Sequence, residues 1–255
     1  MPQQKWPQQI WLVRHGQSAG NVARDAAEAR AGLHIEIDTR DVDVPLSELG
    51  LAQSHALAGW FAALPAAVRP NVVLHSPYAR AADTARIIVN HMGPPAALAV
   101  SSDERLREKE FGILDRLTTH GIALKYPELH VQREHVGKFY FRPPGGESWC
   151  DVILRLRSVL DTITREYCGE RVLIVAHQVI VNCLRYLFER LDESKILEFD
   201  RDADVPNCAV TSYGFDRHVG RNGKLVLQLT NFVAPLEAAG TTVTVQKDVP
   251  CAPKA

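Results

Sequence analysis

The sequence of 255 residues lacks any apolar run near the roughly 20 residues that a membrane-spanning helix needs. Its start, MPQQKWPQQ, is polar and contains prolines, which is unlike the apolar stretch of a signal peptide. Cysteines are few, odd in number and scattered, which argues against a disulfide framework or a zinc site; they are Cys150, Cys168, Cys183, Cys208 and Cys251. We therefore expect a cytoplasmic protein with no membrane contact.

An excess of charge of one sign is also lacking. The formal net charge is −1, so no overall field draws the protein toward nucleic acid, and we expect no nucleic-acid partner. Any site for an anion must be built locally from a few cationic side chains. What the sequence does have is 46% hydrophobic residues over a length that can bury one large α/β core.

Apolar runs and helical periodicities alternate along the chain. Short apolar runs predict strands at 9–13, 71–76, 97–102 and 171–177, with two later strands at 208–215 and 225–232. Apolar residues at helical spacing predict helices over 45–64, 77–92, 147–167 and 178–191. This order predicts an α/β fold: a single three-layer α/β/α domain with a mostly parallel sheet.

The remaining segments divide the chain further. We assign residues 1–9 to a polar N-terminal extension and residues 10–233 to the domain itself. Residues 109–147 interrupt the alternation with Gly, Pro, aromatic and basic residues, which predicts an inserted lid. Residues 234–255 are expected to form a loosely attached C-terminal tail.

Polar side chains follow the predicted parallel strands where each strand ends. Ligands of open α/β sheets bind outside these carboxyl ends, so the side chains are expected to converge. Each of them alone would be read as a structural hydrogen-bonding group or a solvated charge. Arginine near the positive N-terminus of a helix is unfavourable unless an anion lies there, so the set together predicts a phosphate site. The residues are Arg14, His15, Arg80, Glu108 and His177.

Several segments match a known pattern in the order of the chain. They are LVRHGQSAGN (12–21), DVPLSELGLAQ (43–53), SPYARAADTA (76–85), LREKEFG (106–112), GGESWCDVILR (145–155) and VLIVAHQVIVNCLRYLF (172–188). Together they resemble the histidine phosphatase superfamily, the phosphoglycerate mutase-like proteins, over roughly residues 10–190. The resemblance implies the phosphoglycerate mutase-like version of the predicted fold.

Phosphate-ester chemistry explains why these residue types occur together. Arg14 and Arg80 carry fork-shaped donors that match phosphoryl oxygens. His15 can act as nucleophile through its neutral ring nitrogen, if a backbone carbonyl near Gly16 holds the proton on the other nitrogen. By resemblance, His177 donates to the transferred phosphoryl group and Glu108 protonates the leaving oxygen and then activates water.

Further residues complete the expected site. Neutral donors to the phosphate are expected from Gln17, Ser18, Asn21 and Gln178. No metal and no cofactor is expected. Because Glu108 lies in a charged run, Glu104 and Glu110 stay open as alternative acids. The basic residues of the lid are expected to be mostly solvated, with one or two reaching an anionic substrate; they are Lys125, Arg133, Lys138 and Arg142.

The resemblance leaves three functions open. The first is a phosphomonoesterase that acts on a small phosphorylated metabolite through a phosphohistidine. The second is a phosphoglycerate mutase, but the family's mutases typically have Gly after the second histidine, whereas Gln178 resembles the fructose-2,6-bisphosphatase branch. The third, a non-catalytic module that binds a phospho-ligand, is disfavoured because all five core residues are present. Family members are often dimers or tetramers, so a homodimer is also an expectation.

Overall fold

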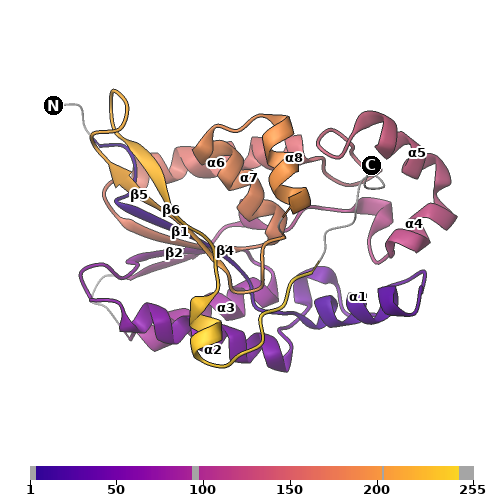
Figure 1. The fold of residues 1–255 in the computed structure, drawn as a ribbon, viewed down its shortest axis with the longest axis horizontal. Coiled ribbons are helices and arrows are strands. Elements are labelled where there is room, and N and C mark those ends of the chain that lie inside the picture. Colours follow the sequence, from indigo (N-terminus) through magenta and orange to yellow (C-terminus); the bar gives the residue numbers. More distant parts are fainter. Residues whose placement is uncertain (1–3, 94–97, 203, 247–255) are drawn as a thin grey trace.

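A six-stranded sheet forms the centre of the computed structural model, which describes residues 4–93, 98–202 and 204–246 (Figure 1). The strand order is β3-β2-β4-β1-β5-β6. The pairs β1–β4, β2–β4 and β2–β3 are parallel, and β5 and β6 are added antiparallel at one edge. The predicted α/β fold is confirmed. Strand bounds are β1 Gln9–Arg14, β2 Val72–His75, β3 Ala99–Ser102, β4 Arg171–Ala176, β5 Val210–Asp216 and β6 Lys224–Phe232.

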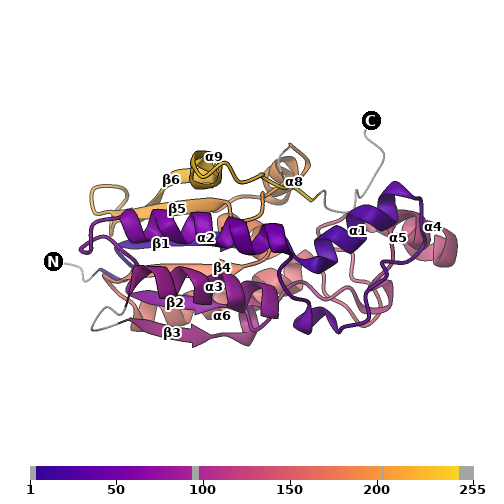
Figure 2. The same cartoon turned by 90° about the horizontal axis from the view of Figure 1, so that it is seen from below.

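Helices cover both faces of the sheet (Figures 1 and 2). On one face lie α2 (Glu48–Ala63), α3 (Ala79–Met92) and the short α9 (Ala234–Ala238); on the other lie α6 (Trp149–Glu166) and α7 (Gln178–Glu189), with α8 (Glu193–Asp202) beside α7. Alternating strand residues feed the two cores. Ile10 and Leu12 of β1 pack toward α6 and α7, whereas Trp11 and Val13 pack toward α2 and α3.

A cap lies beyond the carboxyl ends of the parallel strands (Figures 1 and 2). The predicted lid contains α4 (Thr119–Lys125) and α5 (Pro127–Val136). The rest of the cap comes from α1 (Ala19–Ala29) and the segment after it, which includes the 3-10 turn Asp41–Asp43. Apolar periodicity does not predict α1, because only two of its residues, Asn21 and Ala27, are buried.

Hydrogen bonds to backbone carbonyls join the two halves of the cap. The Thr118 hydroxyl donates to the Gly32 carbonyl over 2.6 Å, and the Ile35 N–H donates to the Arg116 carbonyl over 2.8 Å. A Cβ at Gly121 would lie 2.0 Å from the Leu33 carbonyl oxygen, so only glycine fits there. The lid is therefore one part of a composite cap.

The C-terminal region differs from the expected loosely attached tail. Leu236 of α9 is fully buried against α2 and α3. Past α9, the Asn207 N–H donates to the Thr244 carbonyl over 3.0 Å, and Gln53 Nε2 donates to the Thr242 carbonyl over 2.9 Å. Residues 234–246 are thus a packed part of the domain, because one buried leucine and a set of side-chain amides hold them; the rest of the predicted tail lies outside the described residues.

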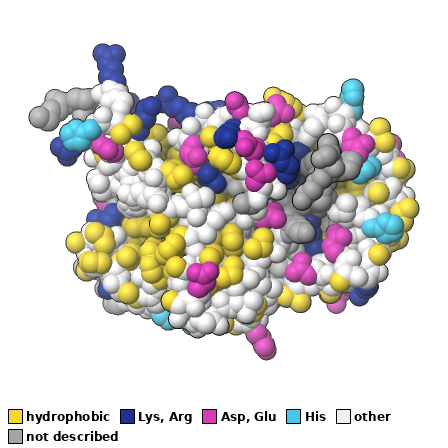
Figure 3. All heavy atoms as spheres, in the orientation of Figure 1, with side chains coloured by type: hydrophobic (Ala, Val, Ile, Leu, Met, Phe, Trp, Pro, Cys, Tyr) yellow, Lys and Arg dark blue, Asp and Glu magenta, His cyan; other side chains and the backbone are white. Residues whose placement is uncertain are grey.

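The N-terminal extension is also attached where it is described. Trp6 packs edge-on against Phe188 at 6.0 Å between ring centroids, and its carbonyl accepts the Gly169 N–H over 3.1 Å. Of the cysteines, Cys251 lies outside the described residues, and Cys150, Cys168, Cys183 and Cys208 are free thiols. None of the helices in the described part of the chain is long and apolar enough to cross a membrane. Figure 3 shows acidic and basic side chains intermingled on one face.

Candidate active site

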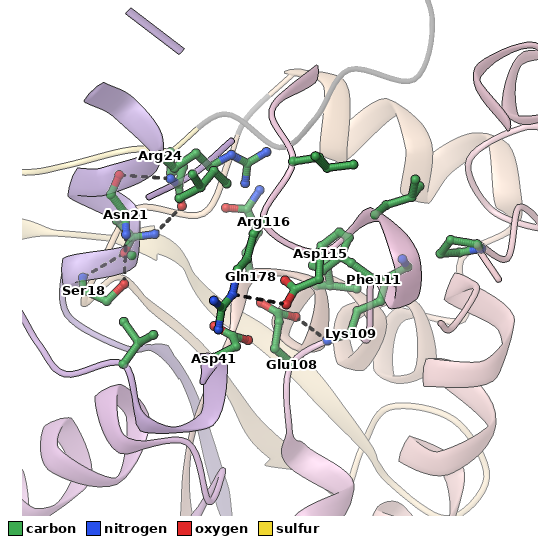
Figure 4. Close-up of a pocket in the computed structure, with 18 of the residues that line it drawn as sticks. Ser18, Asn21, Arg24, Asp41, Glu108, Lys109, Phe111, Asp115, Arg116 and Gln178 are labelled. Atoms are coloured by element: carbon green, nitrogen blue, oxygen red, sulfur yellow. Dashed lines mark hydrogen bonds and ion pairs between the residues drawn. The ribbon is translucent and has the colours of Figure 1, made fainter. Parts of the chain in front are cut away.

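A cavity of about 190 Å³ opens between the carboxyl ends of the parallel strands and the cap (Figure 4). The sheet ends at its floor and the cap forms its walls. Most of the predicted site residues line it: Arg14, His15, Ser18, Asn21, Arg80, Glu108 and Gln178. His177 is fully buried directly behind His15, with 5.1 Å between the two ring centroids. Gln17 is the one predicted site residue whose side chain is turned elsewhere.

Two glycines fix the loop that carries His15. A Cβ at Gly16 would lie 2.5 Å from the Gly50 carbonyl oxygen, and a Cβ at Gly50 would lie 1.9 Å from the Gln17 carbonyl oxygen. The loop therefore packs backbone to backbone against the first turn of α2. Gln53 of α2 completes the contact, since its Oε1 accepts the Gln17 N–H over 2.8 Å.

The proton of His15 is held on the side away from the cavity. Nδ1 lies 2.7 Å from the Gly16 carbonyl oxygen, which only accepts, so Nδ1 donates and Nε2 keeps its lone pair. This confirms the expected backbone partner near Gly16. Burial, followed by the charges of Arg80 and Arg14, holds the pKa of His15 well below its usual value of 6.5. The ring is therefore neutral at pH 7, as a nucleophile must be.

His177 has the opposite arrangement of ring nitrogens. Its Nε2 lies 2.8 Å from the Ser76 hydroxyl, and that oxygen also accepts the Tyr78 N–H over 3.3 Å. Ser76 is fully buried and its O–H needs an acceptor, so we assign the O–H as donor to Nε2 and place the proton of the neutral ring on Nδ1. Nδ1 is buried without a hydrogen-bond partner among the described residues and lies 3.9 Å from Oε2 of Glu108. Burial and Arg80 hold the pKa of His177 well below its usual value, so Nδ1 is a neutral donor.

Glu108 is the carboxyl group closest to this donor. It follows the 3-10 turn Glu104–Leu106, and its side chain is 16% exposed. Burial raises the pKa of Glu108 to about 7, and Asp41 adds to the rise, although the Lys109 N–H and the Arg80 charge oppose it. A carboxyl with such a pKa can give and take a proton near neutral pH. Neither of the alternative acids, Glu104 and Glu110, lines the cavity.

The two arginines have different partners. Arg14 donates to Gln178 Oε1 over 2.8 Å and to the Val205 carbonyl. Arg80 donates to the Asp41 carbonyl over 2.7 Å and to the two carboxylate oxygens of Asp41 over 3.0 and 3.3 Å. Asp41 was not predicted, because it belongs to the half of the cap that has no periodic pattern.

The predicted neutral donors serve partly as structural groups. Ser18 and Asn21 form a reciprocal capping box at the start of α1, and the Asn21 amide also bonds Gln246. Gln17 accepts a hydrogen bond from the Ser47 hydroxyl over 2.8 Å and does not line the cavity. Gln178 lines the cavity and donates to Asp204 over 2.8 Å.

The upper cavity is formed by the cap, which mixes apolar and charged side chains. Of the basic lid residues, Arg133 and Lys138 line it, whereas Lys125 and Arg142 do not; Arg142 pairs with Asp151. The sequence did not single out a second group of lining residues: Lys109, Phe111, Asp115 and Arg116 of the predicted lid, Arg24 and Asp41 of the segment between β1 and α2, and Gln246 of the expected tail. Within the described residues, no group of three or more His, Cys, Asp or Glu side chains is placed to hold a metal ion.

Comparison with known protein families gives the same family that the arrangement of the site residues suggests. The profile of the histidine phosphatase superfamily (branch 1) matches residues 10–226. The chain belongs to this superfamily. The match includes every predicted catalytic residue and both halves of the cap.

Individual relatives in the superfamily differ in activity. A 6-phosphofructo-2-kinase/fructose-2,6-bisphosphatase of Caenorhabditis elegans is 34% identical over 222 residues, which are 84% of this chain and 43% of the relative. The chain therefore spans less than half of that protein. A 2,3-bisphosphoglycerate-dependent phosphoglycerate mutase of Gloeobacter violaceus is 32% identical over 197 residues, 76% of this chain and 82% of the relative.

Solved structures share the fold. A mycobacterial glucosyl-3-phosphoglycerate phosphatase in complex with VO3 has a TM-score of 0.67 at 24% identity, covering 88% of this chain and 99% of that one. The alpha-ribazole phosphatase of Shigella flexneri has a TM-score of 0.66 at 20% identity, covering 88% and 96%. The chain thus resembles the bisphosphatase and the mutase in sequence, and it resembles the two phosphatase structures in fold.

Proposed function

We propose that the protein is a metal-independent phosphomonoesterase that hydrolyses a small phosphorylated metabolite in the cytoplasm through a phosphohistidine. The observation that carries the proposal is the geometry of three side chains. His15 Nδ1 lies 2.7 Å from the Gly16 carbonyl oxygen, which leaves Nε2 unprotonated, and His177 Nδ1 lies 3.9 Å from Oε2 of Glu108, whose pKa burial raises to about 7. A nucleophile, a neutral donor and an acid thus lie around one cavity.

In the first half-reaction, Nε2 of His15 attacks phosphorus and the bond from phosphorus to the ester oxygen breaks. Glu108 gives its proton to that oxygen, so the product leaves as an alcohol and Glu108 becomes a carboxylate. The imidazole ring now carries the phosphoryl group on Nε2, and its Nδ1 keeps its proton and donates it in a hydrogen bond to the Gly16 carbonyl. Arg14 and Arg80 offset the phosphoryl charge, and His177 Nδ1 donates to one of its oxygens.

In the second half-reaction, the Glu108 carboxylate takes a proton from a water molecule as the water oxygen attacks phosphorus. The bond from phosphorus to Nε2 breaks, inorganic phosphate leaves, and His15 returns to its neutral form. Glu108 is protonated again, so the cycle closes without a metal ion. The same carboxyl group acts as acid and then as base, which a pKa near 7 permits.

The test is to trap the intermediate. Wild-type protein is mixed briefly with a ³²P-labelled phosphate ester in excess chelator and denatured, and acid-labile, base-stable label is expected on residue 15. His15→Ala is expected to lose the label and turnover. His75→Ala is a matched control, because His75 is the last residue of β2 and its Nδ1 lies 2.8 Å from the carbonyl oxygen of the next residue, Ser76. Turnover by His15→Ala near the wild-type rate, or activity that needs added metal, would contradict the proposal.

The similarity to phosphoglycerate mutases supports a second candidate, phosphoryl transfer to an acceptor alcohol in place of water. Both reactions share the phosphohistidine, so trapping does not separate them. Release of inorganic phosphate and isomerisation of 3-phosphoglycerate in the presence of 2,3-bisphosphoglycerate do separate them. We expect phosphate release to dominate.

A further inference from the structure

Arg24 lies on the cavity side of α1, one helical turn after Asn21, and both residues line the cavity (Figure 4). Residues three apart are neighbours on a helix surface. The capping box of Ser18 and Asn21 fixes where α1 begins, and so fixes which of its side chains face the cavity. Val22 lies on another face of the helix and is 46% exposed.

The guanidinium of Arg24 is available for a ligand. It is half-buried, and it makes no hydrogen bond and no ion pair with any residue that the structure describes. The other arginines of the cavity wall have such partners: Arg80 pairs with Asp41, and Arg116 donates to the carbonyls of Ile37 and Thr39 over 2.9 and 2.8 Å. A half-buried guanidinium has lost part of its hydration. An anion that bonds to it therefore gains more binding free energy than it would from a fully hydrated arginine at the surface.

The cavity extends beyond the space that a phosphoryl group needs. Arg14, His15 and Arg80 lie at its floor, where the strands end, whereas Arg24 projects from the cap. The wall of the same cavity also includes apolar side chains such as Ile35, Ile37 and Phe111. A substrate whose phosphate lies at the floor therefore has its distal end near Arg24.

We propose that Arg24 binds a second anionic group of the substrate, a carboxylate or a second phosphate at the end opposite the scissile phosphate. The proposal rests on the proposed phosphatase site and adds the class of substrate. A planar guanidinium bonds carboxylate and phosphate oxygens in pairs, which a neutral hydroxyl cannot match. Arg24 thus determines specificity for phosphate esters with two anionic ends.

Matched substrate pairs test this assignment. Glycerol 3-phosphate and 3-phosphoglycerate differ in whether the distal carbon is a hydroxymethyl or a carboxylate group. Fructose 6-phosphate and fructose 1,6-bisphosphate differ in a distal phosphate, so the two pairs distinguish the two anions. The wild type is expected to have a kcat/KM at least about tenfold higher for the anionic member of one pair.

Three variants separate recognition from a structural effect. Arg24→Gln is expected to reduce that preference at least about tenfold, and Arg24→Lys to retain part of it. Arg30→Gln is the matched control: Arg30 is the C-cap residue of α1, but it is exposed, pairs with Glu36 over 3.0 Å and does not line the cavity. It should keep the wild-type preference.

Failure of the role of Arg24 can be distinguished from failure of the proposed phosphatase activity. If no phosphate ester is turned over, the phosphatase proposal fails, and calorimetric titration of the same pairs into His15→Ala still measures the preference as a ratio of Kd values. A wild type with no preference for the anionic member of either pair would overturn the role of Arg24. An Arg24→Gln variant that keeps the preference would also overturn it. So would a variant whose kcat/KM falls equally for both members of a pair.

Discussion

Asp41 holds the guanidinium of Arg80 at the floor of the cavity through its carbonyl and both carboxylate oxygens. Arg80 is buried, with 7% of its side chain exposed, whereas Asp41 is 46% exposed. The carboxylate therefore presents to Arg80 the same pair of oxygens that a phosphoryl group would present. In the proposed site, a phosphoryl group would compete with Asp41 for one fork of donors.

This competition predicts the effect of Asp41→Asn. The neutral amide bonds Arg80 more weakly, so inorganic phosphate and vanadate are expected to inhibit with Ki values about three- to tenfold lower than for the wild type. Inhibition of p-nitrophenyl phosphate hydrolysis measures this directly. Asp43→Asn is the control, since Asp43 belongs to the same turn but pairs with exposed Arg40. Equal or higher Ki values for Asp41→Asn would show that Arg80 does not bind the phosphoryl group.

The pH dependence of kcat/KM follows from the same groups. Glu108 must be protonated to act as acid, so activity is expected to fall as pH rises through about 7, with a slope of −1 in log kcat/KM. His15 must be neutral, and its lowered pKa places the acidic limb well below 6.5. The expected profile is a plateau on the acidic side of neutrality.

Asp41 affects both Arg80, which it bonds, and the pKa of Glu108. Its negative charge contributes to the raised pKa of Glu108. Asp41→Asn removes this charge, lowers the pKa of Glu108, and is expected to move the alkaline limb to lower pH, whereas Asp43→Asn leaves it in place. A limb that stays fixed in Asp41→Asn would assign it to a group other than Glu108.

Glu108→Gln keeps the shape of the side chain but removes the proton that it transfers. Substrates with poor alkoxide leaving groups, such as glycerol phosphates, are expected to lose about 10²–10⁴-fold in kcat/KM. p-Nitrophenolate leaves without a proton, so its burst should survive while the steady-state rate falls, because attack of water on the phosphohistidine still needs the base. A quench-flow measurement separates burst from steady state.

Glu110→Gln controls for loss of a nearby carboxylate. Glu110 accepts the Tyr78 hydroxyl over 3.2 Å and does not line the cavity. The Glu110→Gln variant is expected to retain both the burst of p-nitrophenolate and the wild-type dependence of kcat/KM on the leaving group. Equal loss of burst rate with both kinds of leaving group in Glu108→Gln would assign Glu108 a structural role.

The floor of the site was predictable because its residues lie at strand ends. Uninterrupted apolar runs such as 171–176 define strands, and the residue after each run necessarily lies at the carboxyl edge of a parallel sheet. His15 and His177 could therefore be placed together from sequence alone. The backbone partner of His15 Nδ1 followed from the tight turn at Gly16.

The walls of the cavity were not predictable in the same way. The segment around Asp41 is placed by contacts distant in sequence, such as Thr118 with Gly32 and Arg116 with Ile37. Such contacts join backbone carbonyls to side chains and leave no periodic pattern. Gln17 shows the converse case: its place in the signature predicts a phosphate donor, but its side chain bonds Ser47.

The C-terminal segment gives a last, quantitative prediction, because it is tied to the loop that carries His15. The Thr244 hydroxyl donates to Asn207 Oδ1 over 2.9 Å and accepts the Gln53 amide over 2.9 Å. Asn207 in turn donates to the His15 carbonyl over 3.0 Å, and it is 1% exposed. One hydroxyl group therefore joins residues 241–246 to the backbone of the nucleophile.

Thr244→Val keeps the shape of the side chain and removes this hydroxyl. Asn207 Oδ1 is then buried without its donor, which costs about 1–3 kcal/mol. Urea unfolding is expected to show a free energy of unfolding lower by that amount, and kcat is expected to fall because the His15 loop loses its support. Thr242→Val is the matched control: the residue is exposed, and its contact to Gln53 uses the carbonyl, which valine retains. Equal stabilities of the two variants would mean that the segment is only loosely attached, as the sequence alone predicts.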